Sequence, residues 1–217
     1  MFFLKKLFRK ITIFLKQHWL AFVFFLIVAL LLISPQFLAM HSVGNYNTKT
    51  PFLFQTDEDA YMTRIQEIID GHYLVSSPNF YEYKNISFPI LVPVAEYWYA
   101  VPVMLFDVSL SQVMIVNKFL LPFILCWLVY FFVLKIIIKD NSLNNLSNKW
   151  AAILGAILVV LGYEIVDYRY MLGIISGSLQ NLSMSVWTRP VNPISGAIFL
   201  FSFFLVAWKV VEGKRKW

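Results

Sequence analysis

Charged side chains are scarce in this sequence: Asp, Glu, Lys and Arg together account for 14% of its 217 residues, while 59% are hydrophobic. Soluble domains carry about 25% charged residues, so the composition excludes an ordinary soluble domain and indicates an integral membrane protein. The single cysteine, Cys126, excludes an internal disulfide and a metal cluster of Cys and His ligands. The sequence also has no glycine-rich phosphate loop and no nucleophile elbow.

Four apolar runs are long enough, or nearly so, to cross a bilayer, whose hydrocarbon core takes about 20 helical residues. We therefore expect an all-α integral membrane protein with four transmembrane helices, at 18–40, 110–138, 150–166 and 194–211. The second run is longer than a span requires and contains Pro122, which can kink it. A cleaved signal peptide is the alternative for the first run, but its length and the lack of a small-x-small cleavage pattern favour a retained span.

Lysine and arginine fall mostly on one side of these spans. Twelve of the eighteen lie before the first span, around the loop between the second and third, or after the fourth. Because cytoplasmic loops are rich in Lys and Arg, we expect a cytoplasmic N-terminus at 1–17, loop at 139–149 and C-terminal end at 212–217. The extracytoplasmic loops are then 41–109 and 167–193, and ten of the twelve acids fall on that side. The net charge of +6 is thus sorted by membrane side, and we expect no nucleic-acid partner.

The larger outer loop contains two segments with helical patterns, at about 57–70 and 94–106. In the first, apolar residues recur at helical spacing opposite a polar face, which predicts an amphipathic helix. The apolar residues are Tyr61, Met62, Ile65, Ile68 and Ile69. Gly71 predicts the end of this helix, and the second segment is rich in Tyr, Trp and Phe, which favour the headgroup level. We expect both helices to lie along the membrane surface or against neighbouring spans.

Three acids stand together at the start of the first surface helix, in "QTDEDAY". Thr56 suits an N-cap, and acids in the first turn complement the helix dipole by about 0.3–1 kcal/mol each. Adjacent carboxylates repel each other, so capping alone gives little reason for all of Asp57, Glu58 and Asp59. A carboxylate at this place can also take a proton from an acceptor hydroxyl or bind a divalent metal. The pattern leaves both interpretations open.

Three basic residues are candidates for substrate binding. Arg189, in "WTRPVNP" at the outer end of the fourth span, could grip a lipid phosphate or act as an interfacial anchor beside Trp187. Lys118, a few turns into the second span, is costly there unless it snorkels or pairs. Arg169 lies among acids at the outer end of the third span, where local ion pairing is the alternative to a site.

The acidic pair Asp57-Glu58 follows the first span at once and is itself followed by "DAYMTRIQEIIDGHY". This arrangement resembles the start of polytopic membrane glycosyltransferases of the GT-C superfold. The likeness extends more loosely through "SLSQVMIVNKFLLPF" to "RPVNPISGAIFLF". It implies transfer of a sugar from a polyprenyl-phosphate-linked donor on the extracytoplasmic face of the plasma membrane. It also implies that the catalytic acids are among Asp57, Glu58 and Asp59, with Asp57 as the base, or with Asp57 and Asp59 holding a divalent metal such as Mg or Mn.

The partners that this resemblance implies are the lipid bilayer and the polyprenyl-phosphate-sugar donor. Members of the superfold usually have more than four spans, so we expect an N-terminal portion whose remaining partner is the C-terminal part of the same protein. The alternative from another class is a non-catalytic polytopic protein, either part of a transporter or an envelope scaffold, in which "TDED" only caps a helix. The apolar centres of the spans count against a transporter.

Overall fold

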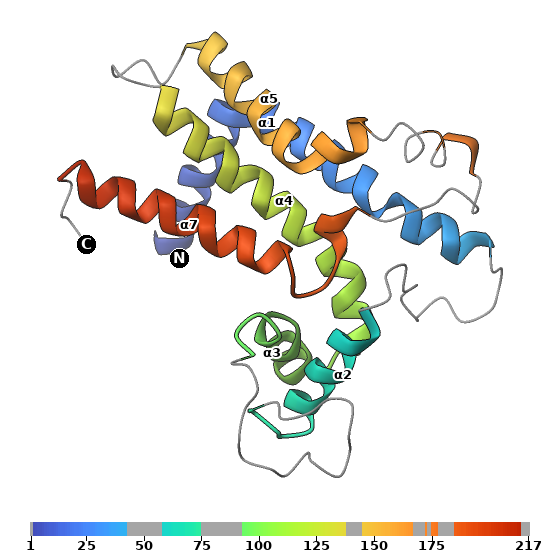
Figure 1. The fold of residues 1–217 in the computed structure, drawn as a ribbon. Coiled ribbons are helices and arrows are strands. Elements are labelled where there is room, and N and C mark those ends of the chain that lie inside the picture. The colour runs from blue at the N-terminus through green and yellow to red at the C-terminus, as the bar shows by residue number, and fades with distance from the viewer. Residues whose placement is uncertain are drawn as a thin grey trace.

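The fold is known from a computed structural model, and all regular elements in its described part are helices, with no strand among them (Figure 1). The described residues are 2–42, 58–74, 93–137, 145–166, 172, 175–177 and 185–213. The elements are α1 (Phe2–Ser42), α2 (Glu58–Ile69), α3 (Tyr97–Phe106), α4 (Leu110–Ile137), α5 (Leu146–Val166), the 3-10 helix η3 (Val186–Thr188) and α7 (Ile194–Val211). The expected all-α class is confirmed for this part of the chain.

Helix α4 is the centre of the bundle. It contacts α1, α5 and α7 along its length, and α3 and η3 near its N-terminal end (Figure 1). Its buried face carries Leu125, Cys126 and Val129, which pack with apolar residues of the three long neighbours. Helix α5 comes close to α4 at Gly155, where an added Cβ would lie 3.3 Å from a methyl group of Val133. A small residue there lets the two backbones approach, as is common between membrane helices.

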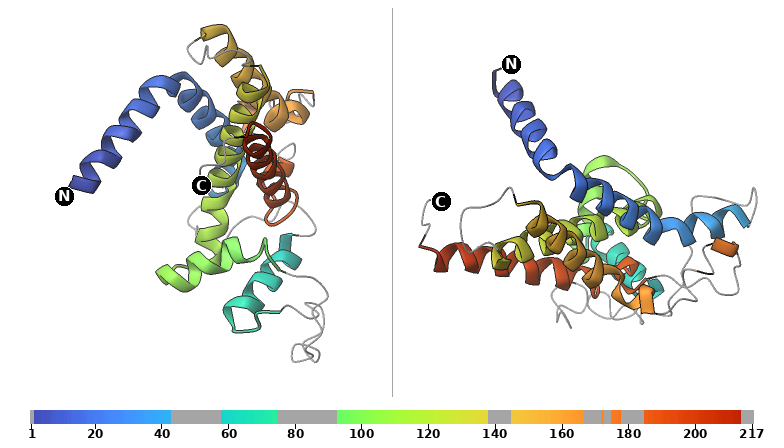
Figure 2. Two further views of the ribbon diagram at one scale, coloured as in Figure 1. Left: turned by 90° about the vertical axis from the view of Figure 1, so that its left-hand side faces the viewer. Right: turned by 90° about the horizontal axis from the view of Figure 1, so that it is seen from above.

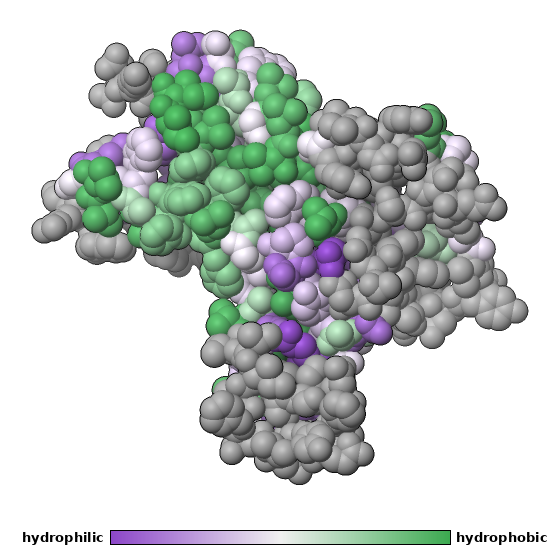
Figure 3. Space-filling view, in the orientation of Figure 1, coloured by the Kyte–Doolittle hydropathy of each residue, from purple (hydrophilic) through white to green (hydrophobic). Residues whose placement is uncertain are grey.

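Three of the helices are long and apolar enough to cross a membrane: Phe8–Ser42 within α1, Leu110–Ile137 and Ile194–Val211. These correspond to three of the four predicted spans. The predicted third span corresponds to α5, which begins at Leu146, four residues earlier than expected, and whose apolar stretch Leu146–Gly162 is shorter. On the face shown in Figure 3, large apolar side chains cover much of the described part of the bundle, which fits a lipid environment. By their length and composition, these helices indicate a membrane protein.

Helix α1 bends at His18, whose backbone angles (φ −124°, ψ 23°) are not helical. The segment before the bend is itself helical and leaves the bundle as a separate arm (Figure 2). At the bend, the Lys149 ammonium of α5 donates to the carbonyl of Gln17 at 2.9 Å. A side chain that binds a backbone carbonyl is one of the known causes of a helix kink. Helix α4, in contrast, continues through Pro122 as one element.

The predicted amphipathic helix is α2, within one residue of the expected bounds. Ile65 and Ile68 of the predicted stripe are fully buried, and Thr63 on the opposite face is exposed. The helix ends at Gly71 as expected, with φ +95° and with hydrogen bonds from the Gly71 and His72 amides back to Ile68 and Glu67. This pair of bonds is the Schellman motif, which glycine favours because it has no Cβ. The buried stripe contacts α3, which in turn contacts α4.

Candidate functional site

A buried polar cluster lies where α1, α2 and α4 meet. Lys118 of α4 has its ammonium 3.2 Å from the carboxylate of Glu58, the first residue of α2. The same ammonium donates to the side-chain carbonyl of Gln36, from α1, at 3.3 Å. All three side chains are 2% exposed or less. We call Gln36, Glu58 and Lys118 the junction cluster.

The helical period of α2 places Glu58 in this cluster. Ile65 is seven residues further on and Ile68 ten, so all three point to the same side of the helix. The face that buries these isoleucines therefore also turns Glu58 inward. Asp59, the next residue, points outward and is exposed. One carboxylate of the acidic triplet is thus selected for burial by its position on the helix.

The same argument places the two partners. Lys118 lies one turn after Met114 and one turn before Leu121, both buried on the inner face of α4. Gln36 follows the fully buried Leu32 by four residues in α1. Each polar side chain therefore lies within a buried apolar stripe of its helix. The amide nitrogen of Gln36 has no hydrogen-bond partner in the described part of the chain.

The ion pair explains how a lysine is tolerated in α4. A lysine at the centre of a membrane helix costs about 2.5–3.5 kcal/mol on insertion scales, unless its charge is compensated. Of the two possibilities open to Lys118, snorkelling and pairing, the structure has pairing, because its side chain is 2% exposed and meets Glu58. The carboxylate of Glu58 is in turn fully buried in this pair.

A second set of contacts joins α2 and α3 to each other and to the start of α7. The Arg64 guanidinium forms an ion pair with Glu96, which is 2% exposed, and the Tyr97 hydroxyl donates to the carbonyl of Tyr73 at 2.9 Å. Tyr99 is buried and hydrogen-bonded to the backbone of Val191. Burial raises the pKa of Tyr99, and the negative charge of Glu58 adds to the shift. The tyrosine therefore stays neutral beside the junction cluster.

Val191 carries backbone strain at this place. Its φ of +67° lies in the left-handed region, which a β-branched residue rarely adopts. The strained residue is held by its backbone contact with Tyr99 and by accepting the amide of Ser195 at 3.2 Å. Residues in such conformations cost roughly 1–3 kcal/mol and often mark functional sites. The strain lies two residues after Arg189, one of the predicted substrate-binding residues.

The structure separates the predicted acids. Asp57 lies outside the described residues, as does Arg169. Glu58 is buried against Lys118, whereas the exposed Asp59 carboxylate accepts a hydrogen bond from the Ala60 amide at 2.7 Å. Glu58 and Asp59 thus point in different directions and do not form one carboxylate pair.

The described residues offer no metal site, since no three His, Cys, Asp or Glu side chains among them come together. Glu58 is unsuited to hold a cation because the ammonium of Lys118 already lies against it. The predicted metal ligands Asp57 and Asp59 remain a prediction. No step through a metal is derived from this arrangement.

Two of the three predicted basic residues are placed. Lys118 meets Glu58, as described, and it is fully enclosed by protein. Arg189 is half-buried at the end of η3, the element that contacts α4 just before α7. The expected choice between a phosphate contact and an anchor beside Trp187 stays open, although Trp187 itself packs partly buried on the core.

Sequence reasoning missed Gln36 and the Arg64–Glu96 pair. The signal for Gln36 was available, because it is a polar residue near the end of an otherwise apolar run. The signal for Glu58 was its place on the α2 stripe. Nothing local marks Glu96, which precedes α3 by one residue and meets a partner 32 positions earlier in the chain.

Comparison of the chain with protein-family models, with curated proteins and with solved structures finds no match.

Proposed function

We propose that this chain belongs to a membrane-embedded glycosyltransferase of the GT-C type. It transfers a sugar from a polyprenyl-phosphate-linked donor on the extracytoplasmic face of the plasma membrane. The motif "TDEDAY" directly after the first span supports this proposal from the sequence side. The structural observation that supports it is the fixed position of the start of α2, the residue directly after Asp57: Glu58 meets Lys118 of α4, and Lys118 also donates to Gln36 of α1.

The proposed topology has four spans, formed by α1, α4, α5 and α7, with both ends of the chain cytoplasmic. It follows from the distribution of Lys and Arg. Gln36 lies near the C-terminal end of α1 and Lys118 near the N-terminal end of α4, so both belong to the same end of the bundle. On this topology that end is extracytoplasmic, where a lipid-linked donor and an acceptor can meet.

In the proposed reaction an acceptor hydroxyl oxygen bonds to the anomeric carbon of the donor sugar. The bond between that carbon and the phosphate oxygen breaks, and polyprenyl phosphate leaves with the electron pair. Asp57 takes the proton of the hydroxyl, which is the ordinary role of a general base. Glu58 holds the helix start in place through Lys118, and Arg189 is the residue suited to contact the phosphate.

A second candidate function is a non-catalytic membrane scaffold, and one observation favours it. The charges of Glu58 and Lys118 are satisfied by each other within the protein, as in a contact that only fastens α2 to the bundle. In that case the acids at the start of α2 cap the helix and carry no chemistry.

The experiment that separates the two uses the protein expressed from its complete gene and reconstituted in proteoliposomes. The donor is a radiolabelled polyprenyl-phosphate hexose or pentose, and the measurement is the label that moves to water-soluble product. We expect Asp57→Asn to lower the rate about 10²–10⁴-fold, the range for loss of a general base. Asp70→Asn is the matched control, because Asp70 is an exposed acid of the same segment and should leave the rate unchanged.

Three outcomes decide the assignment. Loss of transfer in Asp57→Asn alone supports Asp57 as the base. Loss in Asp59→Asn with full activity in Asp57→Asn moves the base by two positions. If the wild-type protein releases no label from either donor, the glycosyltransferase proposal is wrong and the scaffold remains.

A further inference from the structure

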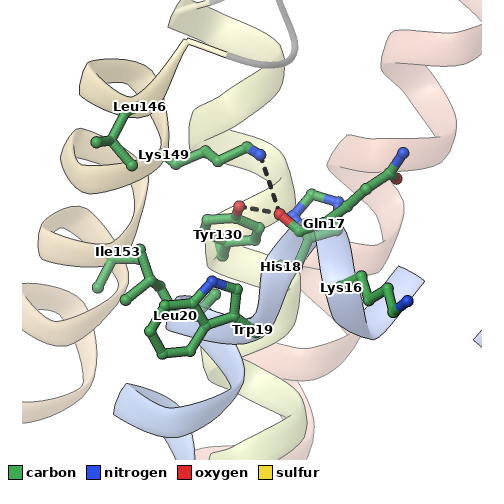
Figure 4. A pocket seen from close by; sticks show the side chains of 10 residues that line it. Lys16, Gln17, His18, Trp19, Leu20, Tyr130, Leu146, Lys149 and Ile153 are labelled. Atoms are coloured by element: carbon green, nitrogen blue, oxygen red, sulfur yellow. Dashed lines mark hydrogen bonds between the residues drawn. The ribbon is translucent and has the colours of Figure 1, made fainter. Parts of the chain in front are cut away.

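The opposite end of the bundle holds an open pocket at the bend of α1, lined by residues of α1, α4 and α5 (Figure 4). Its volume is about 270 Å³. Lys16 and His18 line it from α1, Tyr130 from α4 and Lys149 from α5 (Figure 4). The His18 ring nitrogen Nδ1 lies 2.8 Å from the Tyr130 hydroxyl, and Lys149 donates to the Gln17 carbonyl at 2.9 Å. The bend of α1 and the pocket are thus parts of one arrangement.

The charges that line this pocket are all of one sign. Lys16 and Lys149 are cations, and none of the ten described residues that line the pocket is acidic. An ammonium has three donor hydrogens, and the contact with Gln17 occupies one of those of Lys149. Lys16 is exposed. The pocket therefore offers several N–H donors and a positive potential to an anion.

Apolar side chains form much of the remaining wall, and two of them are exposed at its edge. Trp19 is 57% exposed and Leu146 56%, and both line the pocket together with Leu20 and Ile153. A free inorganic anion makes no favourable contact with apolar walls. A membrane phospholipid does, because its glycerol and acyl chains extend from the phosphate into apolar surroundings. Basic pockets between membrane helices are known to bind phosphate headgroups in this way.

The arm of α1 before the bend combines basic and apolar residues, as the pocket does. Its basic residues share one face of the helix, and four of its exposed apolar residues share the other, with Ile13 as the exception on the basic face. This arrangement is close to the pattern of a helix lying in a membrane interface. The basic residues are Lys5, Lys6, Arg9, Lys10 and Lys16, and the apolar residues are Phe8, Ile11, Phe14 and Leu15. Phe14 packs on Trp127 of α4 with ring centroids 5.3 Å apart, which ties the arm to the bundle beside the pocket. The arm thus places the pocket at the level of lipid headgroups.

We propose that this pocket binds the phosphate of an anionic membrane phospholipid, with Lys16 and Lys149 as its charged partners and the apolar walls against the lipid body. The bend of α1 creates the site, since it brings Lys16 and His18 beside α5. This inference does not depend on the proposed enzymatic function, because it concerns the other end of the bundle.

The test uses the full chain in nanodiscs of equal parts phosphatidylglycerol and phosphatidylcholine. The measurement is the ratio of the two lipids that stay bound when the protein is released into the mass spectrometer. We expect the wild-type protein to retain phosphatidylglycerol preferentially. In Lys16→Gln/Lys149→Gln the preference should fall about 30-fold, which is roughly 2 kcal/mol, or about 1 kcal/mol for each lysine near an anionic surface.

The matched control is Lys5→Gln/Lys10→Gln, which removes the same charge from the arm outside the pocket. It should keep the preference, and Lys149→Arg, which keeps the charge, should keep it as well. An equal loss in the control would mean general attraction to the arm and would overturn the proposal. If the double variant fails to insert, the exposed Lys16→Gln alone must lower the preference about 5-fold, the effect of one such lysine.

A second experiment distinguishes a lipid phosphate from free inorganic phosphate. Inorganic phosphate is added to the detergent-solubilised protein together with short-chain phosphatidylglycerol. Retention of the lipid at millimolar inorganic phosphate supports a lipid site. Displacement of the lipid by inorganic phosphate would mean a pocket for a free anion and would contradict the proposal.

Discussion

The charged side chains at the two ends of the helix bundle have opposite environments. At the junction cluster a cation and an anion from different helices are buried against each other, with 2% and 0% of their side-chain surfaces exposed. At the bend of α1, two lysines line a pocket without any acid among its described residues, and they are accessible. The charges of the junction cluster are compensated within the protein, whereas the lysines of the pocket can bind an anion from outside it.

The difference shows why the presence of charge alone does not identify a binding site. A buried pair of opposite charges already has its compensation, and its removal acts mainly on stability. Cations in an open pocket have no such compensation from the pocket walls, so their removal acts mainly on binding. Substitutions at the two ends test this contrast through the free energy of unfolding.

The largest effect is expected for Glu58→Gln. The substitution leaves the ammonium of Lys118 buried without the carboxylate 3.2 Å away, and breaking a buried pair costs about 3–5 kcal/mol. The free energy of unfolding is measured by detergent denaturation in micelles, followed by tryptophan fluorescence. The control is Asp59→Asn, an exposed neighbour, for which a change within about 0.5 kcal/mol is expected.

Glu58→Gln combined with Lys118→Met should recover most of the loss, because a buried ion pair can often be replaced by neutral side chains. A double variant as unstable as Glu58→Gln would show that the pair is not the cause. The contrast between the two ends would then have no energetic basis at the junction cluster.

A smaller effect is expected for Tyr130→Phe at the other end. The substitution removes the hydroxyl that lies 2.8 Å from His18 and leaves the ring in place, so about 1 kcal/mol should be lost. The same unfolding experiment measures it. Tyr97→Phe, which removes an exposed hydrogen bond to the Tyr73 carbonyl, serves as the comparison and should cost less. If Tyr97→Phe lowered the free energy of unfolding more than Tyr130→Phe, the contact between Tyr130 and His18 would not stabilise the bend as proposed.

The smallest effect is expected for Glu212→Gln. Glu212 and Lys135 form an ion pair of 3.5 Å, but their side chains are 31% and 41% exposed. Exposed pairs contribute about 0–1 kcal/mol, and glutamine can still accept the hydrogen bond from the Trp208 indole, so the stability should change by less than about 0.5 kcal/mol. A loss similar to that of Glu58→Gln would refute the view that burial decides the strength of these pairs.

Much of the fold follows from local sequence patterns. The runs at 110–138 and 194–211 became α4 and α7 with nearly the same bounds, since long apolar runs have few alternatives to a helix. The end of α2 at Gly71 was also predictable, because a Schellman motif depends on neighbours within one turn. The bend at His18 was not, since it involves a lysine 132 positions away from Gln17.

The candidate site was predictable only in part. The acidic triplet and Lys118 were identified as candidates, but their pairing joins positions 60 residues apart, and no local pattern specifies a partner at that distance. Glu58 was grouped with Asp57 and Asp59 by adjacency. The helix instead separates it from Asp59, because consecutive residues on a helix point about 100° apart.

The sequence by itself determined that this is a chain of long apolar helices of the kind found in membrane proteins, and that α2 is amphipathic. These properties depend on composition and on periods of a few residues. Only the tertiary structure decided that Glu58 and Lys118 neutralise each other while Lys16 and Lys149 share an open pocket. The reason is physical: whether a charge is compensated depends on which helices pack together, and that is a property of the whole bundle.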